Sequence, residues 1–225
     1  MTLSRRDLLI GSGALAAAAA LAPPLRAEAA GPVTLTLQSR QIEVDGKAAT
    51  RYGALQPSGA PGLTLAEGDE FHVRLVNELT VPSGLHWHGL TEPWRQDGVP
   101  YLSSPPIAPG GSALYRFPAT PPGTRWMHSH FGLQEQNLLA APLIIRERSA
   151  IASGAQEIVI LLEDFSWTPP EEILAGLKAP KHGDMGHDMQ DGTMKAAAMP
   201  GPDLNDVDYD AYLANDRTLD DPEVV

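Results

Sequence analysis

Phe71-His72-Val73-Arg74-Leu75 alternates apolar and polar residues, and turn-forming residues flank it at Glu67-Gly68-Asp69 and Pro82-Ser83-Gly84. Successive side chains of a β-strand point to opposite faces of a sheet, so this pattern predicts a strand with one buried face. Similar short runs, separated by Gly and Pro, are predicted as strands at Val33–Leu37, Ala113–Phe117, Arg125–His130 and Leu138–Ile145. Many short strands without a sustained helical period predict an all-β fold, a Greek-key sandwich or barrel of about 115 residues.

A second domain is predicted to begin after the small-residue segment 149–154. Glu157–Glu163 is an apolar run that predicts its first strand, and a Met- and His-rich insert follows at residues 178–202. Further predicted elements are a hairpin made of Asp210–Ala214, the turn Asn215-Asp216 and Thr218-Leu219, and a strand at Glu223–Val225. Without the insert, about 50 residues remain, too few to close another sandwich. We therefore predict one complete domain over residues 31–148 and an incomplete second domain over residues 155–225.

Residues 1–29 have the features of an export signal. Ser4-Arg5-Arg6-Asp7-Leu8-Leu9 is a twin-arginine motif, Ile10–Leu21 is uncharged, and Ala27-Glu28-Ala29 offers a small-residue cleavage site. An amphipathic helix is the alternative, but the run has no polar face and Pro23-Pro24 interrupts it. The apolar run is also too short to span a bilayer. The sequence predicts export by the twin-arginine pathway to the periplasm, without stable membrane insertion.

Charge and cysteine content exclude several kinds of partner and site. The chain has 16 basic and 28 acidic side chains, a formal net charge of −12, which argues against binding nucleic acid. Cysteine is absent from all 225 residues. The sequence therefore provides no disulfide and no thiolate ligand for a metal ion.

Four of the seven histidines form two His-x-His pairs, His86-Trp87-His88 and His128-Ser129-His130. Residues i and i+2 of a strand project to the same face, so each pair can present two imidazoles to one point. Two such pairs on neighbouring strands could bring four ring nitrogens to a small polynuclear metal site. Imidazole suits copper, zinc, iron and nickel, so the ligand type leaves the metal open. Pairs of half-buried or surface histidines without a metal are the alternative interpretation.

A cupin metal site is a different explanation of the same residues. His86 and His88 followed by Glu92 match the start of the cupin motif. The rest of that motif is a single histidine shortly after a Pro-x-Gly turn. Pro121-Pro122-Gly123 is instead followed by a histidine pair at the wrong spacing.

Both histidine motifs closely resemble the first two copper motifs of the multicopper oxidases. The resemblance rests on Gly84-Leu85-His86-Trp87-His88-Gly89-Leu90, Asp97-Gly98 and Gly123-Thr124-Arg125-Trp126-Met127-His128-Ser129-His130. It covers almost all of the first predicted domain, and Glu157–Leu174 and Tyr212–Asn215 are similar to the family's second domain. The resemblance implies a cupredoxin-like Greek-key fold and copper as the metal.

The resemblance also implies a role for each histidine. His86 would bind the type 2 copper and His88 one type 3 copper, and His128 and His130 would complete this domain's share of the type 3 pair. These residues are half of the ligands of a three-copper cluster that reduces dioxygen to water. The remaining histidines and the type 1 copper cysteine of the family have no counterpart in this sequence.

Asp97 matches a carboxylate that, in the family, hydrogen-bonds cluster water and supplies protons to reduced oxygen. The alternative is that Asp97 is only a turn residue before Gly98. Trp87 and Trp126 are interpreted as packing residues beside the site. His72 is interpreted as an ordinary solvent-side histidine, because it alternates with the apolar positions of its strand.

The resemblance favours an exported oxidase of Cu(I) or phenolic compounds, with dioxygen as the acceptor and a small reductant as the substrate. The competing hypothesis is a periplasmic module that binds and sequesters copper ions without turnover. Because the type 1 cysteine is missing, we expect this polypeptide alone to have no oxidase turnover.

The 178–202 insert contains Met185, Met189, Met194 and Met199 together with His182 and His187. Thioethers are soft ligands for Cu(I), so this segment could collect or relay copper. A polar linker in which the methionines are incidental is the alternative.

Overall fold

The computed structural model describes residues 31–179 and 207–222, which contain two four-stranded sheets and a smaller two-stranded sheet. One four-stranded sheet has the order β2-β1-β4-β6, and the other has the order β3-β8-β7-β5. The first is formed by β1 (Val33–Val44), β2 (Lys47–Leu55), β4 (Glu70–Asn77) and β6 (Ser112–Pro118). The second is formed by β3 (Leu63–Ala66), β5 (His86–His88), β7 (Gly123–His128) and β8 (Ala140–Arg146). β1 is parallel to β4 and β3 is parallel to β8, whereas the other neighbours in these two sheets are antiparallel.

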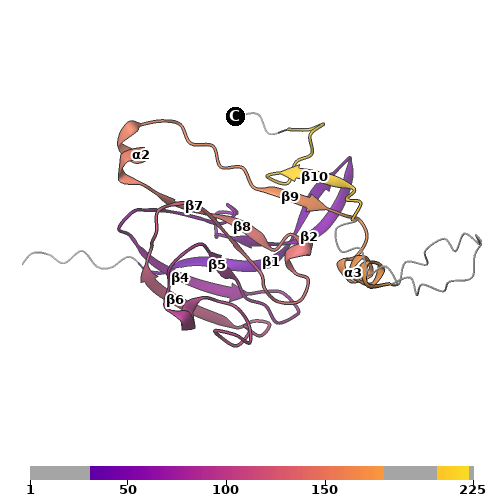
Figure 1. Cartoon of the computed structure of the whole chain (residues 1–225), viewed down its shortest axis with the longest axis horizontal. Helices are drawn as coiled ribbons and strands as arrows, with labels where there is room; N and C mark the ends of the chain where they lie inside the picture. The colour runs from indigo at the N-terminus through magenta and orange to yellow at the C-terminus, as the bar shows by residue number, and fades with distance from the viewer. Residues whose placement is uncertain (1–30, 180–206, 223–225) are drawn as a thin grey trace, which may run out of the picture. The chain divides into compact units, whose positions relative to one another are not determined.

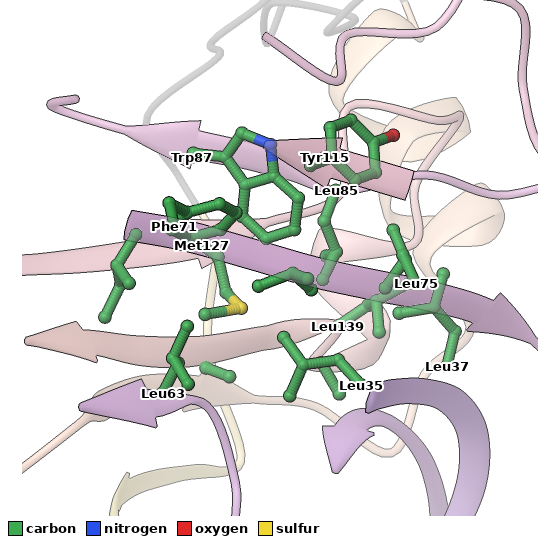
Figure 2. Packing of buried hydrophobic residues seen from close by; sticks show 14 of the residues in the cluster. Leu35, Leu37, Leu63, Phe71, Leu75, Leu85, Trp87, Tyr115, Met127 and Leu139 are labelled. Atoms are coloured by element: carbon green, nitrogen blue, oxygen red, sulfur yellow. The ribbon is translucent and has the colours of Figure 1, made fainter. Parts of the chain in front are cut away.

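The two sheets share one apolar core, to which each contributes alternate residues. In β4 the side chains of Phe71, Val73 and Leu75 are fully buried, as the alternating sequence predicts. Figure 2 shows leucines of β1 and β4 packed beside residues of β3, β5 and β7. The ring of Phe71 stacks on Phe117 at 4.5 Å and meets Trp87 edge-on at 4.8 Å. This all-β, cupredoxin-like sandwich confirms the predicted fold class, and the aromatic contacts fix the short strand β5 to the opposite sheet.

The later part of the chain contains α2 (Arg148–Ser153), β9 (Leu162–Phe165), α3 (Pro170–Lys178) and β10 (Ala211–Ala214), and β9 pairs antiparallel with β10 beside β2 (Figure 1). A second, smaller core joins β9 and β10 to the first sheet. Phe165 and Leu213 are buried in one cluster with Leu138 and the β1–β2 residues Ile42, Val44 and Ala49. The β9–β10 pair therefore packs on the β1–β2 hairpin.

Several predicted element boundaries differ from the structure. The predicted strand Arg125–His130 ends at His128, and the predicted strand Leu138–Ile145 begins only at Ala140. Leu138 cannot belong to a strand because its φ of 61° lies in the left-handed region. Of the predicted strand Glu157–Glu163, only the last two residues lie in β9.

The predicted hairpin after residue 210 is partly correct. Asn215 and Asp216 have positive φ angles of 52° and 66°, and Ala214 bridges to Arg217, so the turn is present. The partner of β10 over its whole length is however β9, not Thr218-Leu219. The export signal at 1–29, the strand at Glu223–Val225 and nearly all of the 178–202 insert lie outside the described residues. None of the helices that the structure describes is long and apolar enough to cross a bilayer.

Candidate metal centre

The two histidine pairs lie on neighbouring antiparallel strands. In the register of β5 and β7, His86 is directly opposite His128, and Trp87 is opposite Met127. Trp87 and Met127 are fully buried in the core, where Figure 2 shows both side chains. Because neighbours along a strand point to opposite faces, His86, His88 and His128 project from the face that is turned away from the core.

Three of the four paired histidines bring their ring nitrogens together. One nitrogen from each of His86, His88 and His128 lies within 4.8 Å of the other two. The closest pair is His88 Nδ1 and His128 Nε2, which are 3.3 Å apart. Convergence on one point was expected from the strand pattern, and the structure shows it for these three rings.

His130 lies beyond the end of β7, but its ring remains beside the others. Its centroid is 4.9 Å from that of His86 and 4.7 Å from that of His128. The ring nitrogens of His130 do not belong to the tight three-nitrogen group. The four rings therefore form one cluster, to which three residues contribute from strands and one from the following loop.

Asp97 contacts the first of these histidines directly. Its Oδ1 atom lies 2.9 Å from His86 Nδ1, and its backbone oxygen lies 3.1 Å from the same nitrogen. With Nδ1 of His86 facing Asp97, Nε2 is the nitrogen left for the cluster. Asp97 therefore lies next to the histidine cluster and contacts His86 in a way that can orient its ring, a contact for which the sequence contains no signal.

The loop that carries Asp97 is held against β5 by two contacts. The indole nitrogen of Trp87 donates a hydrogen bond to the backbone oxygen of Gln96 at 3.1 Å. Gly98 has a φ of 80°, and a Cβ atom at this position would lie only 1.8 Å from the backbone oxygen of Leu85. Only glycine permits this approach, which explains the Asp97-Gly98 sequence.

Glu92 is a second acidic neighbour of His86, and its only signal in the sequence was the partial match to the cupin motif. Ligand atoms of Glu92, His86 and Asp97 lie within 4.8 Å of one another. Burial, and then the neighbouring Asp97 carboxyl, together raise the pKa of Glu92 to about 7. Near neutral pH, part of the population therefore holds a proton on Glu92 beside His86. The signal in the sequence was a glutamate four positions after His88.

His128 is the most enclosed of the four rings, with 7% of its side chain exposed. The Trp126 ring stacks on it at 3.9 Å with an interplanar angle of 5°. Glu135 Oε2 lies 3.2 Å from Nδ1 of His128, although this contact does not meet hydrogen-bond geometry. Burial lowers the pKa of both His128 and His130. The neutral imidazole is thereby favoured, which is the form that binds metal ions.

Gln134 ties the segment after β7 to the segment before β5. Its Oε1 atom accepts hydrogen bonds from Ser83 Oγ at 2.7 Å and Ser129 Oγ at 2.9 Å. Its Nε2 atom donates to the backbone oxygen of Pro82 at 2.9 Å. Pro82 and Ser83 precede the first histidine pair and Ser129 lies between the two histidines of the second, so this buried side chain links the segments that carry the two pairs. No pattern in the sequence pointed to Gln134.

Comparison with known proteins agrees with this geometry. A protein-family model described as multicopper oxidase matches residues 36–150, which is half of the chain. The chain belongs to the multicopper oxidase family. Both histidine motifs lie inside the matched region, and the family implies copper as the cofactor.

The chain is similar to copper-resistance and laccase-type multicopper oxidases. A copper resistance protein A homolog from Pseudomonas syringae pv. tomato is 36% identical over 64% of this chain and 25% of its own length. The multicopper oxidase MmcO from Mycobacterium tuberculosis is 32% identical over 82% of this chain and 37% of its own length. Among solved structures, Fet3p, a multicopper oxidase that functions in iron import, has a TM-score of 0.56 and 26% identity over 66% of this chain and 29% of its own. This chain therefore spans well under half the length of these multicopper oxidases.

The donor set fits the copper that the multicopper oxidase family implies. Imidazole nitrogen is a good copper ligand, and metal–nitrogen bonds in such sites are about 2 Å long. Two nitrogens on one ion are then separated by at most about 4 Å, which the 3.3 Å between His88 Nδ1 and His128 Nε2 satisfies. The looser spacing to His86, within 4.8 Å, suits a second ion or a small ring movement. In a multicopper oxidase, these side chains would be the copper-holding residues of this part of the chain.

Proposed function

We propose that His86, His88, His128 and His130 bind copper as this chain's share of a three-copper, oxygen-reducing cluster. His86 is assigned to the type 2 copper, and the other three histidines are assigned to the type 3 pair. The observation that carries the proposal is the convergence of three ring nitrogens within 4.8 Å on the outer face of β5 and β7. The fourth ring stands less than 5 Å from two of them, centroid to centroid.

Asp97 is proposed as the catalytic carboxylate of this site. Copper held by the histidines would pass electrons from a reductant to dioxygen, and reduction of one dioxygen to two waters takes four electrons and four protons. Asp97 Oδ1, 2.9 Å from His86 Nδ1, can hold a proton at the edge of the cluster and pass it to oxygen-derived groups. Burial favours the neutral imidazole at His128 and His130, so a carboxyl group is the more suitable proton source beside them.

For the whole protein, we propose a periplasmic oxidase of Cu(I) or phenolic compounds, exported by the twin-arginine pathway. Relatives named copper resistance protein A and laccase support these two substrate classes. The twin-arginine motif at Ser4–Leu9 supports the route of export. Dioxygen and a small reductant are the proposed partners of the complete enzyme, and copper ions are the partners of this chain.

The second candidate function is copper binding without turnover. It is favoured by the absence of cysteine from the 225 residues, because a type 1 copper needs a thiolate to receive electrons from a substrate. The four histidines can still hold copper in the absence of that thiolate. The two functions share the same histidine site and differ in whether oxygen is consumed.

Titration with Cu(I) and Cu(II) against a competing chelator tests the shared site. We expect His128→Ala to weaken copper binding at least tenfold, because it removes a nitrogen from the tight group. His72→Ala is the matched control, since His72 lies on β4 outside that group, and it should leave binding unchanged. Equal binding by the wild-type chain and His128→Ala would contradict the assignment.

An oxygen electrode separates the two functions. We expect the copper-loaded chain to consume no oxygen with a phenolic substrate or with Cu(I). Oxygen uptake that disappears in His128→Ala would instead show turnover by this chain and would exclude the sequestering function.

A further inference from the structure

The Nδ1 atom of His128 is a buried polar atom, and the proposed copper site gives it no role. Among the residues that the structure describes, no group meets hydrogen-bond geometry with it. Buried ring nitrogens of this kind are rarely left without a partner, because desolvation without a hydrogen bond is costly. The neighbouring acidic oxygen is Glu135 Oε2, at 3.2 Å.

The ring of His128 has no freedom to turn this nitrogen toward solvent. Trp126 covers one face of the ring at 3.9 Å, nearly parallel, and the side chain is 7% exposed. Nε2 on the opposite side lies 3.3 Å from His88 Nδ1, inside the histidine cluster. The two nitrogens are therefore committed to different neighbours, Nε2 to the cluster and Nδ1 to Glu135.

The backbone of Glu135 is held in place by hydrogen bonds, whereas its carboxylate can still move. It begins the 3₁₀ turn Glu135–Asn137, which the backbone hydrogen bond from Leu138 to Glu135 closes at 2.8 Å. The preceding residue, Gln134, is fixed by its three buried hydrogen bonds. The Glu135 side chain is itself 40% exposed, so a small rotation can align it with Nδ1 without burying a charge.

We propose that Glu135 is a positioning residue that accepts a hydrogen bond from Nδ1–H of His128. This contact fixes the tautomer in which Nε2 carries no proton and presents its lone pair to the cluster. The inference rests on the proposed function, because orienting His128 matters only if this residue binds copper. The tautomer itself can be measured in the metal-free chain. Carboxylates that hold the second nitrogen of a ligand histidine commonly set its tautomer and strengthen metal binding.

The same arrangement occurs on the cross-strand partner of His128. His86, directly opposite His128 in the β5–β7 register, has its Nδ1 against Asp97. His88, by contrast, turns Nδ1 rather than Nε2 toward His128. Glu135 and Asp97 thus act as a matched pair, each directing Nε2 of one histidine into the site.

Nitrogen-15 NMR of the metal-free chain at about pH 8, above the usual pKa of an imidazole, reads the His128 tautomer directly. We expect a protonated Nδ1 in the wild-type chain and in Glu135→Gln, because the amide oxygen can still accept the hydrogen bond. Glu135→Ala should shift His128 toward the tautomer with protonated Nε2. Glu172→Ala, which removes an exposed glutamate of α3, is the matched control and should behave as wild type.

Copper competition titration of the same four proteins provides the second measurement. Loss of an orienting carboxylate typically weakens metal binding 10- to 100-fold. We therefore expect copper affinity to fall 10- to 100-fold in Glu135→Ala and less than tenfold in Glu135→Gln. A wild-type His128 protonated on Nε2, or a tautomer unaffected by Glu135→Ala, would overturn the inference whatever the copper result. Failure of the wild-type chain to bind copper would overturn the proposed function instead, since the NMR result does not depend on metal.

Discussion

His86 and His128 face each other across strands β5 and β7, and each has an acidic side chain against its Nδ1 atom. The strand pairing sets where the two rings stand, and the carboxylates set which nitrogen each ring offers. Strand β5 is only three residues long, so its position depends on Trp87, which is buried beneath it among Phe71 and Tyr115. The candidate metal site therefore stands on a buried aromatic core, although some of its own residues are exposed.

Replacing Gly98 by alanine tests whether the Asp97 loop must approach β5 closely. The new Cβ atom would lie 1.8 Å from the Leu85 backbone oxygen, at a φ of 80°, so the loop must move. We expect Gly98→Ala to lower the free energy of unfolding by about 2–4 kcal/mol, from overpacking and left-handed strain together. Gly110→Ala is the control, because Gly110 also has a positive φ, 73°, but open space around it, and it should lose about 1 kcal/mol. Urea unfolding measures both variants, and equal losses would show that the close approach is unimportant.

The buried Gln134 side chain is expected to be one of the most important polar contributions to stability near the site. Gln134→Ala leaves Ser83 Oγ, Ser129 Oγ and the Pro82 backbone oxygen without the partner that now bridges them. Unsatisfied buried groups cost about 1–3 kcal/mol each, partly relieved by relaxation, so we expect a loss of about 2–4 kcal/mol in urea unfolding. Gln136→Ala, at an exposed position two residues later, should change stability by less than about 0.5 kcal/mol. A loss from Gln134→Ala as small as that would contradict the bridging role.

Glu163 should make the stability of the chain depend on pH. Burial, and then the nearby charge of Asp216, raises the pKa of Glu163 from 4.5 to about 8. The folded chain therefore keeps a proton that the unfolded chain loses. The resulting contribution to the free energy of unfolding is fully present below about pH 4.5 and is lost as the pH rises toward about 8.

We expect thermal unfolding to show this decrease in the wild-type chain, worth about 2–4 kcal/mol between pH 4.5 and pH 8. Glu163→Gln carries no titrating proton and should show a flatter profile. Glu92, whose pKa is also raised, contributes a parallel decrease to both proteins, so their difference isolates Glu163. Parallel profiles for the two proteins would be inconsistent with a raised pKa at Glu163.

Phe165→Ala should release β9 and β10 from the first sheet. Phe165 is fully buried against the β1–β2 hairpin, and removal of a buried phenylalanine costs about 3–5 kcal/mol. Leu162→Ala, on the same strand but 76% exposed, is the matched control. Hydrogen exchange should show β9 and β10 amides losing protection in Phe165→Ala only, while β4 and β6 amides stay protected. Loss of protection in all strands together would instead indicate a single cooperative unit.

Features that depend only on residues close together in the sequence could be predicted from it. The alternation of β4 and the two His-x-His pairs were visible because strand geometry repeats every two residues. Two missed elements also had local signals. Asp45-Gly46, with φ angles of 50° and 74°, is the tight turn from β1 into β2, and Pro170 followed by two glutamates is a typical helix start for α3.

Glu92, Gln134 and Glu135 could not be assigned to the site from the sequence. Each is a common polar residue whose function depends on partners brought close by tertiary packing. Gln134 is 51 and 52 positions away from Ser83 and Pro82, and no sequence period relates them. Asp97 was predictable only through its resemblance to the family motif.

The small core beneath β9 and β10 has a consequence for where the polypeptide can be divided. The match to the multicopper oxidase family model stops at residue 150, yet Phe165 and Leu213, from beyond that point, cover Ile42, Val44 and Ala49. A protein ended at residue 150 would present this apolar patch to water, where such patches promote self-association. The segment matched by the family model is thus shorter than the segment that should be kept together for expression, and a fusion junction belongs after β10.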